Sequence, residues 1–435
     1  MRTRWRDPLP TDAPAPPETP LRVGSREELV YLLAEACELE HGLMCEYLYA
    51  QFSLKRSLDE GLTGPQLARI QAWEESLIAV IKQEMLHLAL STNLLTSLGA
   101  APHFHRPNFP ILSRWYPPGV QVALVPFGER ALRHFIYLER PEGIALDDAE
   151  GFAAADKAAP LMDDTLLMAV AEDFQTVGHL YRGIEDGLGR LVERYGEANV
   201  FIGPARAQAT TEIFEWPELT AVTDLVSAKR AIELIVEQGE GARGDWRNAH
   251  FGVFVSMLDE YLAMRAADPH FEPAREVVPA YVTLPPDVAD DQLTISAPLT
   301  AEVADLFSAV YQTTLQALTR FFVHSTETPA QVDALARTAK HLMSWVMRPL
   351  GAVLTTLPRS ESDSRGVGPT FQMVEPTLYF LPHRDAAWRI LSERIAEVDQ
   401  RMSALASAVP ALAPIEVRLR SIVEDVATNA AGTAR

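Results

Sequence analysis

The sequence predicts an all-α protein, built as a bundle of long helices over residues 25–267 and followed by a second helical half. Two observations predict this class. Apolar residues recur at spacings of three and four over long stretches of the chain, which is the period of an amphipathic helix. Strand-like runs are limited to two short segments, QVALVPF and HFIYLE, within the irregular residues 101–160. At 435 residues the chain is long enough for one large core or for two or three domains.

Shifts in composition divide the chain into four parts. Residues 1–24 are rich in proline and are expected to form a mobile arm. Residues 25–267 form the predicted bundle, and residues 268–298, which contain DPHFEP and VTLPPD, form a predicted linker. Residues 299–435 are expected to form a C-terminal helical region that packs on the bundle.

Helix signals place the individual elements in order. Ser25 and Glu28 fit a capping box at the start of the first helix, which is predicted to extend as far as Ser57. Pro65 begins a second long helix that ends at Leu98. The remaining helices are predicted over residues 161–195, 224–239, 250–267, 300–325, 330–357 and 385–408.

Charge and cysteine content restrict the partners and the compartment. A formal net charge of −21 argues against a nucleic acid or an anionic membrane as partner. No window approaches the roughly 18 uncharged apolar residues that a membrane span needs, and the N-terminus shows no secretory signal. The two cysteines, Cys37 and Cys45, fall on one predicted helix, where a disulfide between them would break the helix. Reduced thiols and a cytoplasmic location are therefore predicted, and a homo-oligomer is left open.

The stretch ELEHGLMCEYLYAQFS, residues 38–53, carries acids and a histidine within the apolar stripe of the first helix. At 100° per residue, Glu40 falls on the same face as the leucines and alanine of that stripe and therefore points into the core. Glu38 and His41 fall off that face. They are expected on the flank of the helix, either solvated or paired with each other.

The second helix repeats the pattern more clearly. In IKQEMLHLAL, Glu84 and His87 are three residues apart and share the buried face of the helix. A buried carboxylate without compensation costs several kcal/mol, so it needs a proton or a partner. A cation bound by both side chains would meet that need, and inward Glu residues with Glu-x-x-His are the ligand pattern of di-iron and di-manganese bundles. The alternative is that Glu84 pairs with a buried arginine or histidine and binds no metal.

Two later segments add further candidate ligands. His250 heads a helix whose core residues follow at helical spacing, so it faces inward, although a core histidine can equally be held by a hydrogen bond alone. Glu240 lies between two glycines that end the preceding helix and can turn inward without helical geometry. His179 lies opposite the apolar stripe of its helix, and a helical-wheel projection leaves open whether it is buried or solvated.

Several of these segments together resemble the ferritin-like domain of the iminophenyl-pyruvate dimer synthases of violacein and rebeccamycin biosynthesis. The segments are LEHGLMCEYLYAQFSL, EMLHLALSTNLLTSLGAAP, VGHLYRGI and IVEQGEGARGDWRNAHFGVF, and later LFSAVYQTTLQALTRFF, MRPLGAVLTTLP and GVGPTF. The resemblance covers most of residues 25–375 and lies in the order and spacing of the motifs. It implies a ferritin-like four-helix bundle with a metal site between its helices.

Carried over by position, the ligands implied by the resemblance are Glu40, Glu84, His87, His179, Glu240 and His250. The family usually has glutamate at position 179, which would complete the four carboxylates and two histidines of a di-iron site. His179 removes one negative charge, so the implied cofactor is iron as one or two ions, with manganese or copper as alternatives. The family often has a further acid at the position of Gln83, which is expected to face away from Glu84.

The resemblance implies a non-haem metal oxidoreductase of specialised metabolism. Its substrate would be a small molecule such as an amino-acid-derived imine or 2-oxo acid, with dioxygen or a peroxide as the oxidant. Tyr47, two turns from Glu40 on the same stripe, is the candidate catalytic residue, as a redox or hydrogen-bonding partner of the site. Its alternative interpretation is a core aromatic. The alternative function is a ferritin-like scaffold or partner protein that has lost its chemistry.

Overall fold

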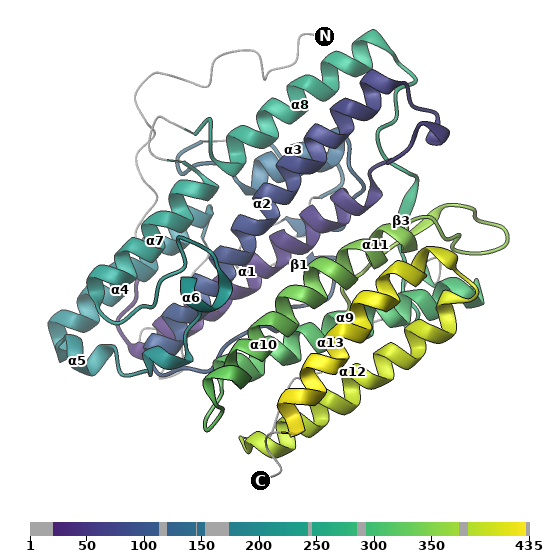
Figure 1. The fold of residues 1–435 in the computed structure, drawn as a ribbon. Helices are drawn as coiled ribbons and strands as arrows, with labels where there is room; N and C mark the ends of the chain where they lie inside the picture. The colour runs from purple at the N-terminus through teal and green to yellow at the C-terminus, as the bar shows by residue number, and fades with distance from the viewer. Residues whose placement is uncertain are drawn as a thin grey trace.

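The computed structural model describes residues 21–112, 120–144, 146–152, 174–241, 246–284, 293–373 and 382–431. Their helices stack in layers (Figure 1). The antiparallel pair α1 and α2 forms the central layer. α3, α4, α7 and α8 cover one side of this pair, and the C-terminal helices α9 to α13 lie on the other. The predicted all-α class is confirmed.

The central pair begins at the predicted signals, but α1 ends at Ser53 rather than at the predicted Ser57, because Leu54 is extended and forms a β-bridge with Ala274. α1 spans Arg26–Ser53 and starts with a complete capping box between Ser25 and Glu28. α2 spans Gly64–Ser97, with the side chain of Thr63 capping its first turn. Because both helices are covered on two sides, their buried residues extend around most of the circumference toward the middle of the molecule.

The third and fourth members of the bundle are each interrupted. α3 (Glu129–Leu138) and α4 (Val177–Tyr195) supply one, and α7 (Leu225–Gly239) and α8 (His250–Ala267) supply the other. α3 packs on α8 and α4 packs on α7, while Figure 1 shows α7 and α8 following one another along α2. The chain therefore places helix ends, with their polar groups, in the middle of the bundle.

Two predictions about these segments need correction or fall outside the described residues. HFIYLE is not strand-like but belongs to the end of α3, because residues 131, 132, 135, 136 and 138 of that helix are buried at helical spacing. The predicted helix over 161–195 is confirmed from Val177 onward, and its first part lies outside the described residues.

The segment predicted as a linker, residues 268–298, contains a strand. β3 (Val277–Pro279) pairs in parallel with β4 (Gly366–Gly368), so this segment is tied to the C-terminal half. A second two-stranded sheet joins β1 (Ile111–Leu112) to β2 (Gln121–Val122), within QVALVPF. Gly368 has no room for a Cβ because the ring of Tyr49 lies against it, so β4 also packs closely on α1.

The C-terminal region consists of long helices. α9 spans Pro298–Phe322, and the predicted helix over 330–357 is observed as α10 (Pro329–His341), a π-helical turn (Leu342–Met347) and α11 (Arg348–Leu354). α12 spans Arg384–Ala406, and α13 (Ala413–Ala431) is an additional helix that was not predicted. Short helical segments complete the chain: Leu58–Glu60, Glu197–Val200 (α5), Ala205–Ala207, Thr211–Phe214 (α6) and Pro410–Leu412.

Residues 21–24, assigned to the mobile arm by composition, contact the bundle. The side chains of Leu21 and Val23 are buried, and they occupy the space above Gly183 and Gly187 of α4. Residues 1–20 lie outside the described residues. Cys37 and Cys45 are both free and buried, as predicted.

Candidate metal centre

Four carboxylates and two imidazoles lie buried in the middle of the bundle, between α1 and α2 on one side and the interrupted helices on the other. None of these side chains is more than 4% exposed. They are Glu40, Glu84, His87, Glu139, Glu240 and His250.

Each of these residues is held by a defined position in an element. Glu40 lies in the middle of α1, and Glu84 and His87 share one face of α2. The other three lie at the helix interruptions: Glu139 follows the last residue of α3, Glu240 follows the last residue of α7, and His250 is the first residue of α8. Helices far apart in sequence therefore converge on one buried volume.

The ligand atoms of this cluster approach one another without forming ordinary hydrogen bonds. Nδ1 of His250 lies 2.8 Å from Oε1 of Glu84 and 3.4 Å from Oε1 of Glu139. Nδ1 of His87 lies 3.4 Å from Oε2 of Glu40 and 3.5 Å from Oε2 of Glu84. Both carboxylate oxygens of Glu84 and Nδ1 of His250 nevertheless lack a hydrogen bond of normal geometry. Lone pairs that converge in this way fit a shared cation better than one another.

Glu84, His87 and His250 form the tightest part of the cluster. One ligand atom from each of them lies within 4.8 Å of the others. Buried polar atoms without partners are rare in proteins and need an explanation such as a bound ion. The residues present therefore fit a metal ion.

Two glutamines orient the imidazoles. The Nε2 atom of His87 lies 3.0 Å from Oε1 of Gln238, and the Nε2 atom of His250 lies 3.1 Å from Oε1 of Gln83. An amide oxygen can only accept, so each Nε2 carries the proton, and Nδ1 is left to face the carboxylates. Gln83 was expected to have no part in the site, but its contact with His250 gives it a role that the sequence analysis did not assign.

Two phenols hold the carboxylates. The hydroxyl of Tyr47 donates to Oε1 of Glu139, and the hydroxyl of Tyr181 donates to Oε1 of Glu40 at 2.6 Å. Tyr47 is fully buried and its ring packs edge-on against Phe135. It is thus a core aromatic whose hydroxyl also reaches the cluster, and its candidate catalytic role stays a prediction.

Burial and mutual repulsion shift the protonation of the cluster. Burial raises the pKa of Glu40 to about 7 and that of Glu240 to about 8. Burial opposes protonation of the imidazoles, but the carboxylates beside them outweigh it and raise the pKa of His87 to about 10 and that of His250 to about 9. In the absence of a metal the cluster therefore retains protons that a bound cation would replace.

Glu240 and His179 lie at the edge of the cluster. Each oxygen of Glu240 accepts a backbone hydrogen bond, from Gly178 at 2.6 Å and from Glu142 at 3.2 Å. Burial is the main cause of the raised pKa of Glu240, and the charge of Glu139 adds to it. His179 is buried in the first turn of α4, where its Nδ1 accepts from the backbone N–H of Gln175 at 3.4 Å.

The partners and the burial of Glu38 and His41, which flank Glu40, differ from those expected. Glu38 is not paired with His41 but lies 2.8 Å from Nε2 of His103. His41 is neither solvated nor on an open flank: it is fully buried on the opposite side of α1 from the cluster, where it contacts Tyr311 of α9. The wheel misplaced it because α1 is covered by helices on two sides.

Sequence reasoning missed Glu139. The segment before it was interpreted as strand-like, which hid the helical spacing of Leu132, Phe135 and Ile136 with Glu139. That spacing of three, four and seven residues was the signal that could have identified it.

Comparisons with known proteins agree with this architecture. A family model described as Ferritin-like matches residues 33–259. Dichlorochromopyrrolate synthase of Lentzea aerocolonigenes is 28% identical over 422 residues, covering 89% of this chain and 40% of that protein. The 2-imino-3-(indol-3-yl)propanoate dimerase of Chromobacterium violaceum is 27% identical over 374 residues, covering 81% of this chain and 34% of that protein. The chain thus spans less than half the length of either curated relative.

A solved structure and the helix hydropathy complete the comparison. A ferritin-like protein from Caulobacter vibrioides superposes with a TM-score of 0.45 at 19% identity, covering 73% of this chain and 96% of that one. Among the described helices, none combines the length and the apolar character required to cross a bilayer.

Proposed function

Because the chain belongs to the ferritin-like family, we propose that it is a non-haem metal-dependent oxidoreductase. Its metal would be held by Glu40, Glu84, His87, Glu139 and His250, with Glu240 and His179 at the edge of the site. The observation that carries the proposal is the pair of unpartnered carboxylate oxygens of Glu84, which face two imidazole nitrogens in the interior.

The donor set supports iron, with two ions as the preferred number. With Glu139 included, the cluster has four carboxylates and two imidazoles, which is the set found in two-ion carboxylate bundles. The carboxylate lost at position 179 is thereby replaced from α3. Carboxylate-rich sites suit iron and manganese better than copper, which prefers softer or nitrogen-rich surroundings.

The protein residues have separable roles in this proposal. When bound, the metal would supply the binding site for dioxygen or a peroxide and undergo the change of oxidation state. Gln83 and Gln238 keep the proton of each imidazole on Nε2, so that Nδ1 is available as a ligand. Tyr47 and Tyr181 hold one oxygen each of Glu139 and Glu40, which fixes the direction of the second oxygen.

The substrate class is a further part of the proposal. The name of one curated relative, 2-imino-3-(indol-3-yl)propanoate dimerase, describes an imine of a 2-oxo acid that carries an indole ring. We therefore include an amino-acid-derived imine or 2-oxo acid as the substrate. The coupling reactions of those longer proteins are not assigned to this chain.

Metal analysis of the purified protein tests the proposal. We expect one to two iron or manganese ions per chain, loss of this metal in Glu84→Gln, and retention in Glu260→Gln. Glu260 is a suitable control because it is a partly exposed glutamate of α8, ion-paired with Arg69. Substrate-dependent oxygen uptake by the metal-loaded protein is the activity readout. A folded protein that takes up no metal from an iron- or manganese-supplemented culture would contradict the proposal and favour the scaffold alternative.

A further inference from the structure

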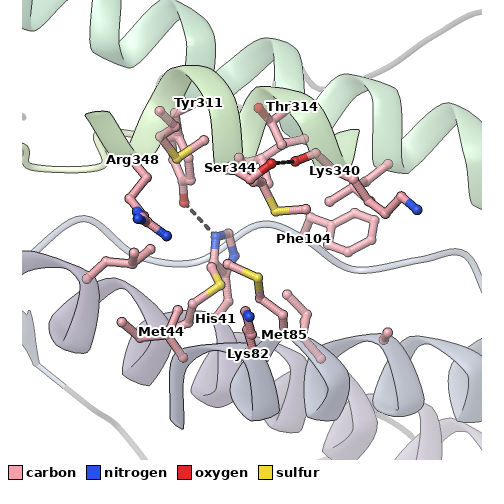
Figure 2. A pocket seen from close by; sticks show the side chains of 18 of the residues that line it. His41, Met44, Lys82, Met85, Phe104, Tyr311, Thr314, Lys340, Ser344 and Arg348 are labelled. Atoms are coloured by element: carbon pink, nitrogen blue, oxygen red, sulfur yellow. Dashed lines mark hydrogen bonds between the residues drawn. The ribbon is translucent and has the colours of Figure 1, made fainter. Parts of the chain in front are cut away.

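A cavity of about 270 Å³ lies on the opposite face of the α1–α2 pair from the carboxylate cluster, between that pair and the C-terminal helices. Figure 2 shows His41, Met44, Lys82 and Met85 reaching into it from one wall and Tyr311 and Thr314 from the other. None of the six clustered acids and histidines lines it. The cavity is therefore separate from the candidate metal centre.

The lining of the cavity is apolar and adaptable. Four methionines and several aromatic rings make up much of its wall, and methionine side chains adjust readily to the shape of an apolar ligand. The residues are Met44, Met85, Met343, Met347, Phe52, Phe104, Phe214, Trp216, Phe322 and Phe371. Sites of this kind bind the apolar body of a small molecule and add few polar contacts.

The charged groups of the lining are all cations. Lys82, Lys340 and Arg348 line the cavity, whereas no aspartate or glutamate does so among the described residues. This is unexpected in a chain with 59 acids and 38 bases. Lys340 is 2.7 Å from Glu215, but the side chains of Lys82 and Arg348 make no hydrogen bond or ion pair with any described residue. They come from opposite walls, on α2 and at the start of α11.

The floor of the cavity adds a buried positive charge. The hydroxyl of Tyr311 lies 2.6 Å from Nε2 of His41, to which it is hydrogen-bonded, and it accepts from Arg106 at 3.2 Å (Figure 2 shows the first contact). Arg106 is fully buried, and its partners are carbonyl oxygens and the ring of Phe109 rather than a carboxylate. The potential at this end of the cavity is therefore positive.

A π-helical turn shapes the same wall. Residues 342–347 form this turn, and Met343, Ser344 and Met347 of it face the cavity. Pro349 follows, and because it has no N–H it removes a regular helix hydrogen bond and crowds the preceding turn. Such turns are frequent at functional sites because they redirect side chains.

We propose that this cavity binds an apolar organic anion, whose body lies among the methionines and aromatic rings and whose charge lies between Lys82 and Arg348. The positive floor and the absence of lining acids favour an anion over a neutral or cationic molecule of the same shape. The site is independent of the proposed metal chemistry, because it lies across the α1–α2 pair from the cluster.

Calorimetric titration of the full chain with four probes tests this site. Decanoate and 2-naphthoate represent aliphatic and aromatic anions, and decanol and decyltrimethylammonium are the neutral and cationic controls. We expect saturable binding of one anion per chain, with the better of the two anions identifying the type of apolar body. Decanol and the cation should bind more weakly than decanoate.

Variants locate the binding. Lys82→Met with Arg348→Met should weaken anion binding by roughly twofold to thirtyfold, which is the range for the loss of two exposed charge pairs. Arg389→Met, an exposed arginine on the outer helix α12, is the matched control and should change nothing. Leu318→Trp should fill the cavity and abolish binding while the metal content stays at the wild-type value.

Two results would overturn the proposal: decanol binding as tightly as decanoate, or unchanged anion affinity in the doubly substituted protein. Glu84→Gln should bind the anion like the wild type. The anion measurements can therefore be interpreted even if the metal proposal is wrong. Conversely, a cavity variant that loses anion binding but keeps its normal metal content reports on this cavity and not on the metal site.

Discussion

Glu84 is the residue on which the proposed metal site depends most. Its carboxylate is 1% exposed, and neither of its oxygens has a hydrogen-bond donor of normal geometry. Burial would raise its pKa, but the charges of His250 and His87 outweigh burial and lower it. An ionised buried group in this position is stable only beside positive charge, and a divalent metal ion concentrates the charge of two protonated imidazoles at one point.

Glu139 provides a test of the ligand set at the level of one side chain. Glu139→Gln keeps the shape but removes the charge, so we expect metal affinity to fall by at least about 100-fold, since outer partners of ligands alone change affinity by roughly 10–100-fold. Competition with a fluorescent chelator measures the change. Glu129→Gln at the exposed start of the same helix is the control. Equal affinities in the two variants would remove Glu139 from the site.

Gln238 tests the role of the imidazole orientation. Gln238→Leu removes the acceptor of the Nε2 proton of His87, which frees that ring to change tautomer or rotate. We expect a decrease in metal affinity of roughly 10–100-fold with the fold intact. The chelator competition and a circular dichroism spectrum report the two quantities. Unchanged affinity would show that the hydrogen bond does not set the ligand geometry.

The sequence identified those cluster residues that lie on helices with a clear stripe. Glu40, Glu84 and His87 could be predicted because a helical wheel shows which residues point inward. Gln83, Gln238 and Tyr181 could not be, because their contacts cross between elements distant in sequence. Their roles depend on the helix pairing, which periodicity does not reveal.

At the scale of the elements, interrupted helices position the site. The ends of α3 and α7 and the start of α8 allow Glu139, Glu240 and His250 to enter the bundle from directions that a continuous helix would not permit. The backbone N–H of Gly178, in the first turn of α4, holds Glu240 in this arrangement.

Gly178 tests that arrangement. A Cβ at this position would collide with the carboxylate of Glu240, so Gly178→Ala must displace it, at a cost of about 1–3 kcal/mol in the free energy of unfolding. We expect weaker metal binding in the same variant. Gly189→Ala on the same helix is the control, because a Cβ there meets nothing within 4 Å. Thermal unfolding and chelator competition give the two readouts, and matching behaviour of the two variants would contradict the assignment.

His134 joins α3 to α1 and gives the fold a pH dependence. Its Nδ1 lies 2.9 Å from Asp148 and its Nε2 lies 3.4 Å from Glu46 of α1. Burial opposes its protonation, but these carboxylates outweigh burial and raise its pKa to about 9. Because the pKa is raised above the unfolded value of about 6.5, the stabilisation is fully present below pH 6.5 and is lost as the pH rises through 9.

The variant His134→Gln should therefore lower the free energy of unfolding by on the order of 3 kcal/mol at pH 6 and by much less at pH 10. Burial also raises the pKa of Glu46. This shift, like that of His134, makes the free energy of unfolding fall as the pH rises. Urea unfolding with a chelator present measures the difference. His103→Gln, at a partly exposed pair, should change stability by less than about 1 kcal/mol. A pH-independent effect of His134→Gln would contradict the ion-pair account.

The boundaries of elements were predictable where caps mark them. Ser25, Pro65 and Asp224 mark helix starts correctly, and α8 begins at the predicted His250. α3 and α13 were missed, because a helix of 10 residues between loops and a helix beginning after a proline-rich turn give weak periodic signals. The strand pairing of β3 with β4 joins segments about 90 residues apart and has no local signature.

At the scale of the whole molecule, the α1–α2 pair separates two different environments. One face carries the acidic cluster with its two imidazoles, and the other carries the apolar cavity with its cations, which Figure 2 shows. Neighbouring residues of one helix, such as Glu40 and His41, contribute to opposite faces. A metal bound at the cluster would tie α1, α2, α3 and α8 together and stabilise the folded chain by mass action.

The most direct test of the metal site is the anomalous scattering from crystals of the protein loaded with iron or manganese. The account predicts one or two anomalous peaks in the bundle interior, within about 2.0–2.3 Å of an oxygen of Glu84 and of Nδ1 of His87 or His250. Loaded crystals with no anomalous peak among these side chains, or with peaks only at the protein surface, would contradict it.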